Sequence, residues 1–296
     1  MKTLYKISFL ILIVFSVTSC RKKDDGSELN DAITWEYYSS SVRYTDPKVQ
    51  EALSEIELDD QCKVDIKLLF PRTDSEKYEP LRQELHDFLL DRFVADGHEI
   101  LNLKADDPQA FVNSFVDYQI SMFKEEISEI SSIYLEGDHT PFSLLVKEFY
   151  LSDSLLYNKN GIVSIGLNNY EYSGGAHGTS IFSCRSYDLK NHSPISPSTL
   201  FQDPKAQGIL DAIEDQILAD YGVESIKELQ ESNGIFSLTG SEVVMSNEFY
   251  FSEKGITFYY NPYEIAAYAY GSTEVTVPYS VLAPYFRSQY QFLGKL

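Results

Sequence analysis

The sequence predicts an α+β protein of two mixed modules, each built from an antiparallel sheet with packed helices. Strand-like segments precede two long helical segments in the first half of the chain, whereas strands flank a single helix in the second half. Turns containing glycine and asparagine separate the strands of the second half. We therefore place an N-terminal module at residues 32–140 and a C-terminal module at residues 141–296.

Two strands followed by two helices are predicted in the N-terminal module. Segments 33–44 and 62–70 have strand patterns, and in the second of them apolar residues alternate with lysine and aspartate. The first helix has leucine and phenylalanine at helical spacing over residues 81–89. The second begins at Asp107-Pro108, a capping acid before a proline, and its apolar stripe runs through Met122 to Ile130. Both stripes are expected to face the core.

The C-terminal module is predicted to start with a three-stranded meander and to end with three short strands. Its helix begins at Asp203-Pro204 and ends at Gly222, with isoleucines on one face. Turns are expected at Asn160-Gly161 and at residues 174–178. The strands are predicted at residues 142–157, 161–172, 179–189, 248–251, 255–260 and 274–277.

The first 19 residues have the pattern of a secretory signal peptide. Lys2 and Lys6 form a short positive region at the start of the chain, and the apolar run over residues 4–15 is too short to be kept as a membrane-spanning helix. The run ends in Val-Thr-Ser-Cys, which resembles the lipobox of bacterial lipoproteins, where the chain is cut before the cysteine and the thiol is acylated. Cys20 would then carry the lipid. The alternatives are a plain secretory signal or an N-terminal anchor with a chance cysteine.

Residues 20–31 are expected to form a lipidated tether. They begin Arg-Lys-Lys-Asp-Asp after the cysteine and continue with glycine, serine and acidic residues. A lysine followed by two acids resembles the surface-export signal of Bacteroidetes lipoproteins. We therefore expect an outer-membrane lipoprotein at the cell surface, with retention on the periplasmic face as the alternative.

The chain is strongly acidic, with 45 acidic residues, 24 basic residues and a formal charge of −21. Removing residues 1–19 would take away two lysines and change the charge to −23. This charge argues against nucleic-acid binding, which needs lysine and arginine to displace counterions. Anionic lipid head groups would repel so acidic a chain, so the Cys20 lipid is the expected membrane contact. The same charge favours a basic protein as partner.

After Cys20, the remaining cysteines are Cys62 and Cys184. They could form a disulfide in an oxidising compartment. However, both lie in strand-like apolar runs, and we assign those runs to different modules. We therefore expect two buried free thiols, with pairing left open.

The most specific motif of the folded part is Tyr-Glu-Tyr-Ser-Gly-Gly-Ala-His-Gly at residues 170–178. Tyr187-Asp188-Leu189 and Leu200-Phe201 follow, and Gly-Ile-Thr-Phe-Tyr-Tyr-Asn-Pro-Tyr-Glu-Ile-Ala stands at residues 255–266. Together these motifs resemble the extracytoplasmic domain shared by lysozyme-sensing RsiV anti-sigma factors and the non-catalytic part of the peptidoglycan deacetylase PdaC. The resemblance covers roughly residues 144–286, and residues 33–137 look like the usual preceding partner domain.

The resemblance implies binding at the cell envelope. It does not extend to a sigma-binding segment or a deacetylase domain, because the sequence has no His-x-x-x-His pair and no Thr-Phe-Asp-Asp string. The Gly-x-Ser-x-Gly motif of serine hydrolases, the His-Glu-x-x-His motif of zinc proteases and the glycine-rich loop that binds phosphate are also missing, so we expect no cofactor and no metal. With so many acids in the chain, carboxylate catalysis can be neither located nor excluded from the sequence.

His177 and the tyrosines of residues 259–270 are the candidate binding residues. Glycines around His177 permit a tight turn with positive φ, and the ring itself could pack, contact a partner or bind a metal. About half of the tyrosines should face the core, while the others could form contacts. The predicted binding set is Tyr172, Gly174, Gly175, His177, Tyr263, Glu264 and Tyr268.

The resulting expectation is a lipid-anchored, non-enzymatic binding protein that recognises a basic protein such as lysozyme, or cell-wall glycan. The alternative is a hydrolase that cleaves glycan or peptidoglycan with a carboxylate pair. For the binding version, we expect the 174–178 turn and the 259–271 segment to lie on the same side of the C-terminal module, because binding residues concentrate in irregular connections.

Overall fold

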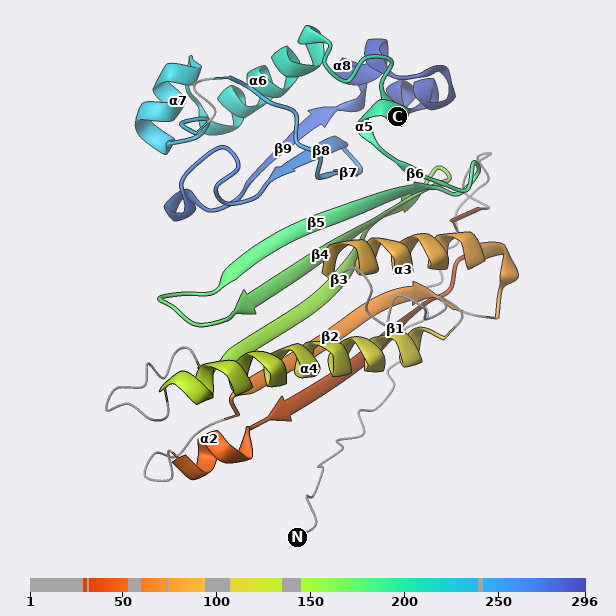
Figure 1. Cartoon of the computed structure of the whole chain (residues 1–296). Coiled ribbons are helices and arrows are strands. Elements are labelled where there is room, and N and C mark those ends of the chain that lie inside the picture. Colours follow the sequence, from red (N-terminus) through yellow and green to blue (C-terminus); the bar gives the residue numbers. More distant parts are fainter. Residues whose placement is uncertain are drawn as a thin grey trace.

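The computed structural model describes residues 29–30, 32–52, 60–72, 74–93, 107–134, 145–238 and 242–296. It confirms the α+β class, with a six-stranded sheet and a three-stranded antiparallel sheet (Figure 1). The predicted signal peptide and Cys20 lie outside the described residues. Within the described part, no helix is both long enough and apolar enough to cross a membrane.

The larger sheet has the strand order β1-β2-β3-β4-β5-β6. Neighbouring strands are antiparallel except for β2 and β3, which are parallel, so this sheet is mixed. A parallel pair needs a long crossover, and the two long helices lie within it. Its strands are β1 (Trp35–Tyr44), β2 (Cys62–Pro71), β3 (Lys147–Lys159), β4 (Ile162–Tyr172), β5 (Thr179–Asp188) and β6 (Ser193–Ile195).

The predicted module boundary at residue 140 lies outside the described residues, and the large sheet continues across it. Val64 of β2 is in register with Phe149 of β3. The first hydrophobic core gathers residues from Ile33 to Leu189 and the second gathers residues from Tyr157 to Leu293. The two cores therefore overlap along the chain between Tyr157 and Leu189, which sequence patterns could not reveal because they do not show which strands pair.

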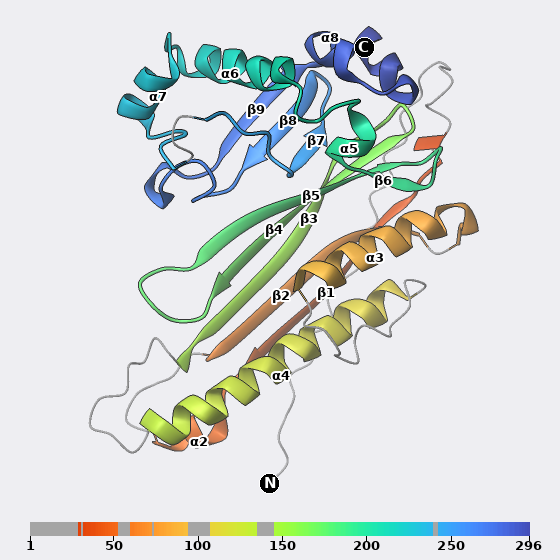
Figure 2. The same cartoon turned by 45° about the horizontal axis from the view of Figure 1, so that its top comes forward.

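Helices α3 (Glu79–Phe93) and α4 (Pro108–Tyr134) cover one face of the large sheet (Figures 1 and 2). Helix α4 begins where predicted, and Asp107 accepts a hydrogen bond from the Ala110 N–H at 2.9 Å. The buried face moves from Phe111 towards Ile127 along this long helix because the sheet beneath it twists. Met122 is therefore 36% exposed at the border of the apolar stripe, not in the core as predicted.

The smaller module consists of a sheet covered by helices on one side (Figure 2). Its longest helix, α6 (Gln207–Tyr221), starts three residues after the predicted proline because Asp203 instead caps a turn, accepting from the Lys205 N–H at 2.9 Å. The helix ends at Gly222 as predicted, in the left-handed conformation. The other elements are α5 (Pro197–Leu200), α7 (Ile226–Asn233), β7 (Phe249–Phe251), β8 (Gly255–Tyr260), β9 (Thr273–Pro278) and α8 (Tyr279–Leu282), with 3-10 helices η4 (Tyr268–Tyr270), η5 (Ala283–Tyr285) and η6 (Ser288–Lys295).

Short elements complete the first module, namely α2 (Pro47–Ala52) and the 3-10 helix η1 (Glu76–Tyr78). Folded structure also begins earlier than the predicted end of the tether. Asn30 is buried, and its side chain accepts from the Gly161 N–H at 2.6 Å and donates to the Ile162 carbonyl at 2.9 Å. The end of the tether is thus part of the fold because it satisfies the backbone of the β3–β4 hairpin.

Strand β4 is buried at its start and more exposed towards its end, because the smaller module covers only part of it. Residues 162–167 are buried, with α3 and α4 on one side of the sheet and β7 on the other. The Phe251 N–H of β7 donates to the Ser164 hydroxyl at 3.2 Å. Asn168 is exposed and the following residues are half-buried. The helix-free face of the sheet is therefore open beyond residue 167.

The two described cysteines are free and buried, as expected. They do not lie in different modules: Cys62 is in β2 and Cys184 in β5 of the same sheet, with β3 and β4 between them. Burial raises the pKa of the Cys62 thiol to about 12 and also raises that of Cys184. Both thiols are consequently held in the unreactive protonated form.

Candidate functional site

Side chains of the smaller module form hydrogen bonds to the backbone of β5, and these bonds hold the smaller module against the edge of that strand. The Asn261 amide accepts from the Phe182 N–H and donates to the Phe182 carbonyl, each at 2.8 Å. The Glu248 carboxylate accepts from the Cys184 N–H at 2.7 Å, and the Cys184 thiol donates to the Phe249 carbonyl at 3.0 Å. These contacts replace a neighbouring strand, so the exposed edge of β5 is satisfied without one.

The glycine turn after β4 is held by its own backbone and by one tyrosine. Gly174 and Gly175 have φ values of 93° and 91°, which glycine adopts without the strain that a side chain would cause. The Tyr172 hydroxyl donates to the Gly175 carbonyl at 3.0 Å. His177 therefore lies in the connection between β4 and β5, which ends this hairpin.

Three ring side chains stack where this turn meets the β8–β9 connection. The His177 and Tyr268 rings have centroids 4.5 Å apart and planes at 13°, while Tyr263 and Tyr268 are 5.6 Å apart. The Tyr268 hydroxyl donates to the Gly178 carbonyl at 3.3 Å. We name His177, Tyr263 and Tyr268 the tyrosine patch. The turn and the 259–271 segment thus lie on the same side of the molecule, as the sequence argument required.

The environment of His177 narrows the three roles considered for it. The residue is exposed, and its Nδ1 lies 3.0 Å from the Gly178 carbonyl, so this nitrogen carries the proton and donates. Asp188 lies at the opposite end of β5, where it accepts from Tyr290. Across the described part of the chain, no three His, Cys, Asp or Glu side chains are grouped for a metal ion. The geometry therefore favours a surface contact over a buried structural ring.

Some of the other predicted residues stabilise the fold, and others are exposed at the surface. Glu264 is exposed, and its carboxylate accepts from the Asn261 N–H at 3.0 Å, which stabilises the loop that holds Asn261. Tyr260 is buried and donates to the Val244 carbonyl at 2.6 Å. Tyr263 and Tyr270 are 60% and 53% exposed. About half of this tyrosine cluster thus faces solvent.

A hollow of about 200 Å³ lies beside the patch on the helix-free face of the large sheet. Its floor comes from β3, β4 and β5, and Tyr259 of β8 forms part of its wall. Tyr150 and Tyr170 stack across neighbouring strands with centroids 5.7 Å apart, and Tyr259 lies 4.3 Å from the Phe182 ring. The lining residues are Tyr150, Ser152, Asn168, Asn169, Tyr170, Ser180, Ile181, Phe182 and Tyr259.

Sequence reasoning missed this hollow. The alternation of Asn168, Tyr170 and Tyr172 after a buried run signals a strand face that becomes open, but the approach of Tyr259 depends on tertiary structure. Gly178 lies between the hollow and the tyrosine patch. A Cβ at this residue would lie 2.5 Å from the Cζ atom of Tyr170 in the hollow, and the Gly178 carbonyl accepts from Tyr268 of the patch.

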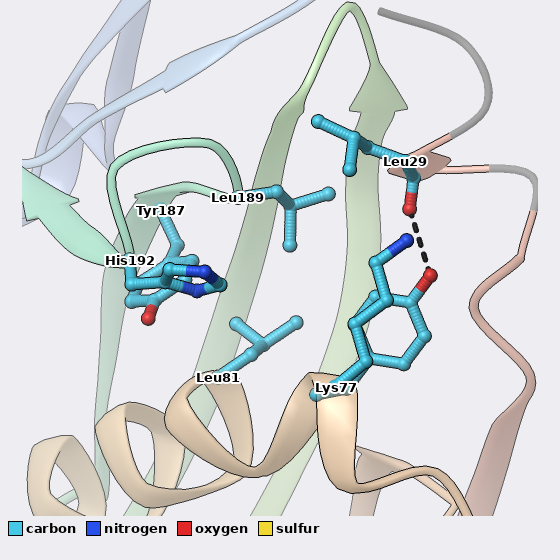
Figure 3. Close-up of a pocket in the computed structure, with 7 residues that line it drawn as sticks. Leu29, Lys77, Leu81, Tyr187, Leu189 and His192 are labelled. Atoms are coloured by element: carbon cyan, nitrogen blue, oxygen red, sulfur yellow. Dashed lines mark hydrogen bonds between the residues drawn. The ribbon is translucent and has the colours of Figure 1, made fainter.

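A second cavity, drawn in Figure 3, carries no site. It lies between η1, α3 and the end of β5, where Tyr78 donates to the Leu29 carbonyl at 3.0 Å. Its volume of about 10 Å³ is barely enough for one water molecule.

Asp153 is a described carboxyl group whose pKa is raised far above its ordinary value. It lies just past the point where β2 and β3 separate, and both its oxygens accept from the Leu69 N–H at 2.9 Å. Burial raises its pKa to about 8, against the opposing effects of these hydrogen bonds and of Lys67. The carboxyl group therefore keeps its proton at neutral pH.

Two family profiles match the chain. The profile "Deacetylase PdaC" matches residues 98–180 and "Protein of unknown function (DUF3298)" matches residues 198–280. Residues 198–280 are therefore similar to the DUF3298 domain. This confirms the resemblance to the extracytoplasmic RsiV and PdaC domain. The PdaC match extends across residue 140 into α4, and so includes the last predicted helix of the N-terminal module.

Solved structures of DUF3298 family proteins have the same fold. A member from Bacteroides fragilis is 19% identical with a TM-score of 0.71, and the alignment covers 89% of this chain and 96% of that one. A protein from Pseudomonas aeruginosa is 18% identical with a TM-score of 0.57, covering 88% and 97% of the two chains. Among curated proteins, none matches this chain significantly. These likenesses establish the fold, whereas the function must be argued from the site.

Proposed function

We propose that this protein is a lipid-anchored, non-enzymatic binding protein of the cell envelope, displayed on the outer membrane. It recognises a basic protein such as lysozyme through the tyrosine patch, and cell-wall glycan is the second candidate ligand. The observation that carries the proposal is the stack of the exposed His177 ring on the half-buried Tyr268 ring, which joins two irregular connections on one surface. Anchoring rests on the lipobox-like sequence before Cys20.

Side-chain chemistry supports a protein ligand at this patch. Tyrosine is enriched among the residues that dominate binding energy, because it combines a large rigid ring with a polar tip. Tyr263 is 60% exposed, so its ring has much area left to bury. The chain charge of −21 would speed encounter with a basic partner and make the association sensitive to salt.

The test is binding of lysozyme to the ectodomain and its variants, measured by biolayer interferometry at several salt concentrations. Tyr263→Ala and Tyr268→Ala should each weaken binding by about tenfold or more, as expected for central aromatic contacts. His177→Ala should weaken binding while the melting temperature stays nearly unchanged, because the ring is exposed. Tyr221→Ala is the matched control, since Tyr221 is a 39% exposed tyrosine at the end of α6.

Absence of saturable, salt-sensitive binding to lysozyme or another basic envelope protein would refute the protein-ligand proposal. The hydrolase alternative is tested separately, by incubating the ectodomain with peptidoglycan and a polysaccharide panel. Release of soluble products would establish catalysis and refute the non-enzymatic assignment.

A further inference from the structure

We infer that the hollow between β3, β4, β5 and Tyr259 is a separate site for one ring of a neutral saccharide. This inference rests on the proposed binding role and gives it a second site with its own ligand chemistry. The site is distinct from the tyrosine patch, because His177, Tyr263 and Tyr268 do not line the hollow.

The side chains that line the hollow are uncharged. None of its nine residues carries a formal charge, although 23% of the chain is charged. An anionic or cationic ligand would find no opposite charge there, and desolvating it would cost free energy without compensation. A neutral ligand avoids this cost. The lining therefore favours a neutral ligand over the basic segments expected at the patch.

The hollow combines ring faces with polar groups. A pyranose has an apolar C–H face and a rim of hydroxyl groups, so it needs a flat ring and several donors and acceptors. The stacked pair Tyr150 and Tyr170 offers ring surface on the floor, and Tyr259 adds a ring from the smaller module. Asn168 and the serine hydroxyls supply donors and acceptors, and Asn168 is exposed.

The size and position of the hollow also fit one sugar ring. At about 200 Å³ the hollow is smaller than the roughly 300–1,000 Å³ typical of drug-sized ligands, so it suits a single ring. Beyond it, the same sheet face continues with polar side chains, including Ser39 and Ser41 of β1 opposite Lys67 and Asp65 of β2. One sugar unit could occupy the hollow while the rest of an oligosaccharide lies along this open face.

Contacts across the modules hold the hollow in shape before any ligand binds. Gly166 leaves space for the Phe182 ring, since a Cβ at residue 166 would lie 2.7 Å from that ring. The Asn261 amide fixes the Phe182 backbone, and Tyr259 packs on the Phe182 ring. A preformed site loses little conformational entropy on binding, which suits a small and weakly interacting ligand.

The experiment is isothermal titration calorimetry of the ectodomain with chitotetraose and with maltotetraose, two neutral tetrasaccharides of different linkage and substituents. At least one should bind saturably with a Kd of about 1 mM or lower. Asn168→Ala and Tyr259→Ala should each weaken that binding at least tenfold. Raising sodium chloride from about 50 to 500 mM should leave the Kd unchanged, because no charges interact.

Tyr221→Ala is the matched control. Tyr221 is a 39% exposed tyrosine at the end of α6 and lies outside the hollow and the open sheet face, so this variant should bind the sugar like the unaltered protein. Lysozyme binding measured on the same variants separates the two proposals. Loss of lysozyme binding alone would count against the patch. Absence of saturable sugar binding, or sugar binding that Asn168→Ala and Tyr259→Ala leave unchanged, would overturn the assignment of the hollow.

Discussion

The Asn261→Ala variant should be strongly destabilised, because this side chain takes the place of a strand beside β5. Its amide makes two hydrogen bonds of 2.8 Å to the backbone of Phe182, and both are buried. Removing the amide leaves one buried N–H and one buried carbonyl unpaired, at about 1–3 kcal/mol each. We expect a loss of about 3 kcal/mol, or about 6–12 °C in melting temperature for a protein of this size.

The assay combines differential scanning calorimetry with hydrogen exchange of the Phe182 amide. The Phe182 N–H should lose protection in Asn261→Ala before the rest of β5 exchanges, because its bonding partner is gone. Asn168→Ala is the matched control: Asn168 is exposed and in register with Phe182 on β4, so its removal should change stability by no more than about 0.5 kcal/mol.

Asn261→Asp separates the two hydrogen bonds. Aspartate keeps an acceptor for the Phe182 N–H but turns a second oxygen towards the Phe182 carbonyl, so it should not rescue stability. If Asn261→Ala lowers stability by less than about 1 kcal/mol, or leaves protection of the Phe182 amide intact, the amide does not substitute for a strand and the reasoning fails.

Two further predictions follow from the same structure. The pKa of Asp153 is raised to about 8 in the folded protein. Between about pH 4 and 8 the folded state therefore holds a proton that the unfolded state has lost. The free energy of unfolding should consequently fall as pH rises through this range. Thermal unfolding across this range should show a shallower fall for Asp153→Asn, and equal slopes would contradict the assignment. Gly178→Ala should displace the Tyr170 ring, since the new Cβ would lie 2.5 Å from its Cζ atom, and should change near-ultraviolet circular dichroism and weaken sugar binding. Gly222→Ala is the control, because no atom lies within 4 Å of the added Cβ. It should lower only the melting temperature, since residue 222 has a positive φ. Equal effects of the two variants on sugar binding would contradict the role of Tyr170.

The sequence by itself determined the local structure of this protein. Periodicity located the strands and the two long helices, since side-chain spacing reports directly on a buried face. Asp107-Pro108 marked the start of α4 and Gly222 the end of α6, because caps depend on a few neighbouring residues. The glycine-rich motif before His177 likewise predicted a turn that the structure contains.

Tertiary structure alone decided how these elements combine. The parallel pairing of β2 with β3 joins segments that the pattern assigned to separate modules, because pairing depends on contacts distant in sequence. Asn30 looked like part of a flexible tether until its hydrogen bonds to the β3–β4 hairpin placed it in the fold. The hollow arises for the same reason: Tyr170 and Tyr259 lie far apart in sequence, and only the packing of β8 beside β5 brings them to one surface.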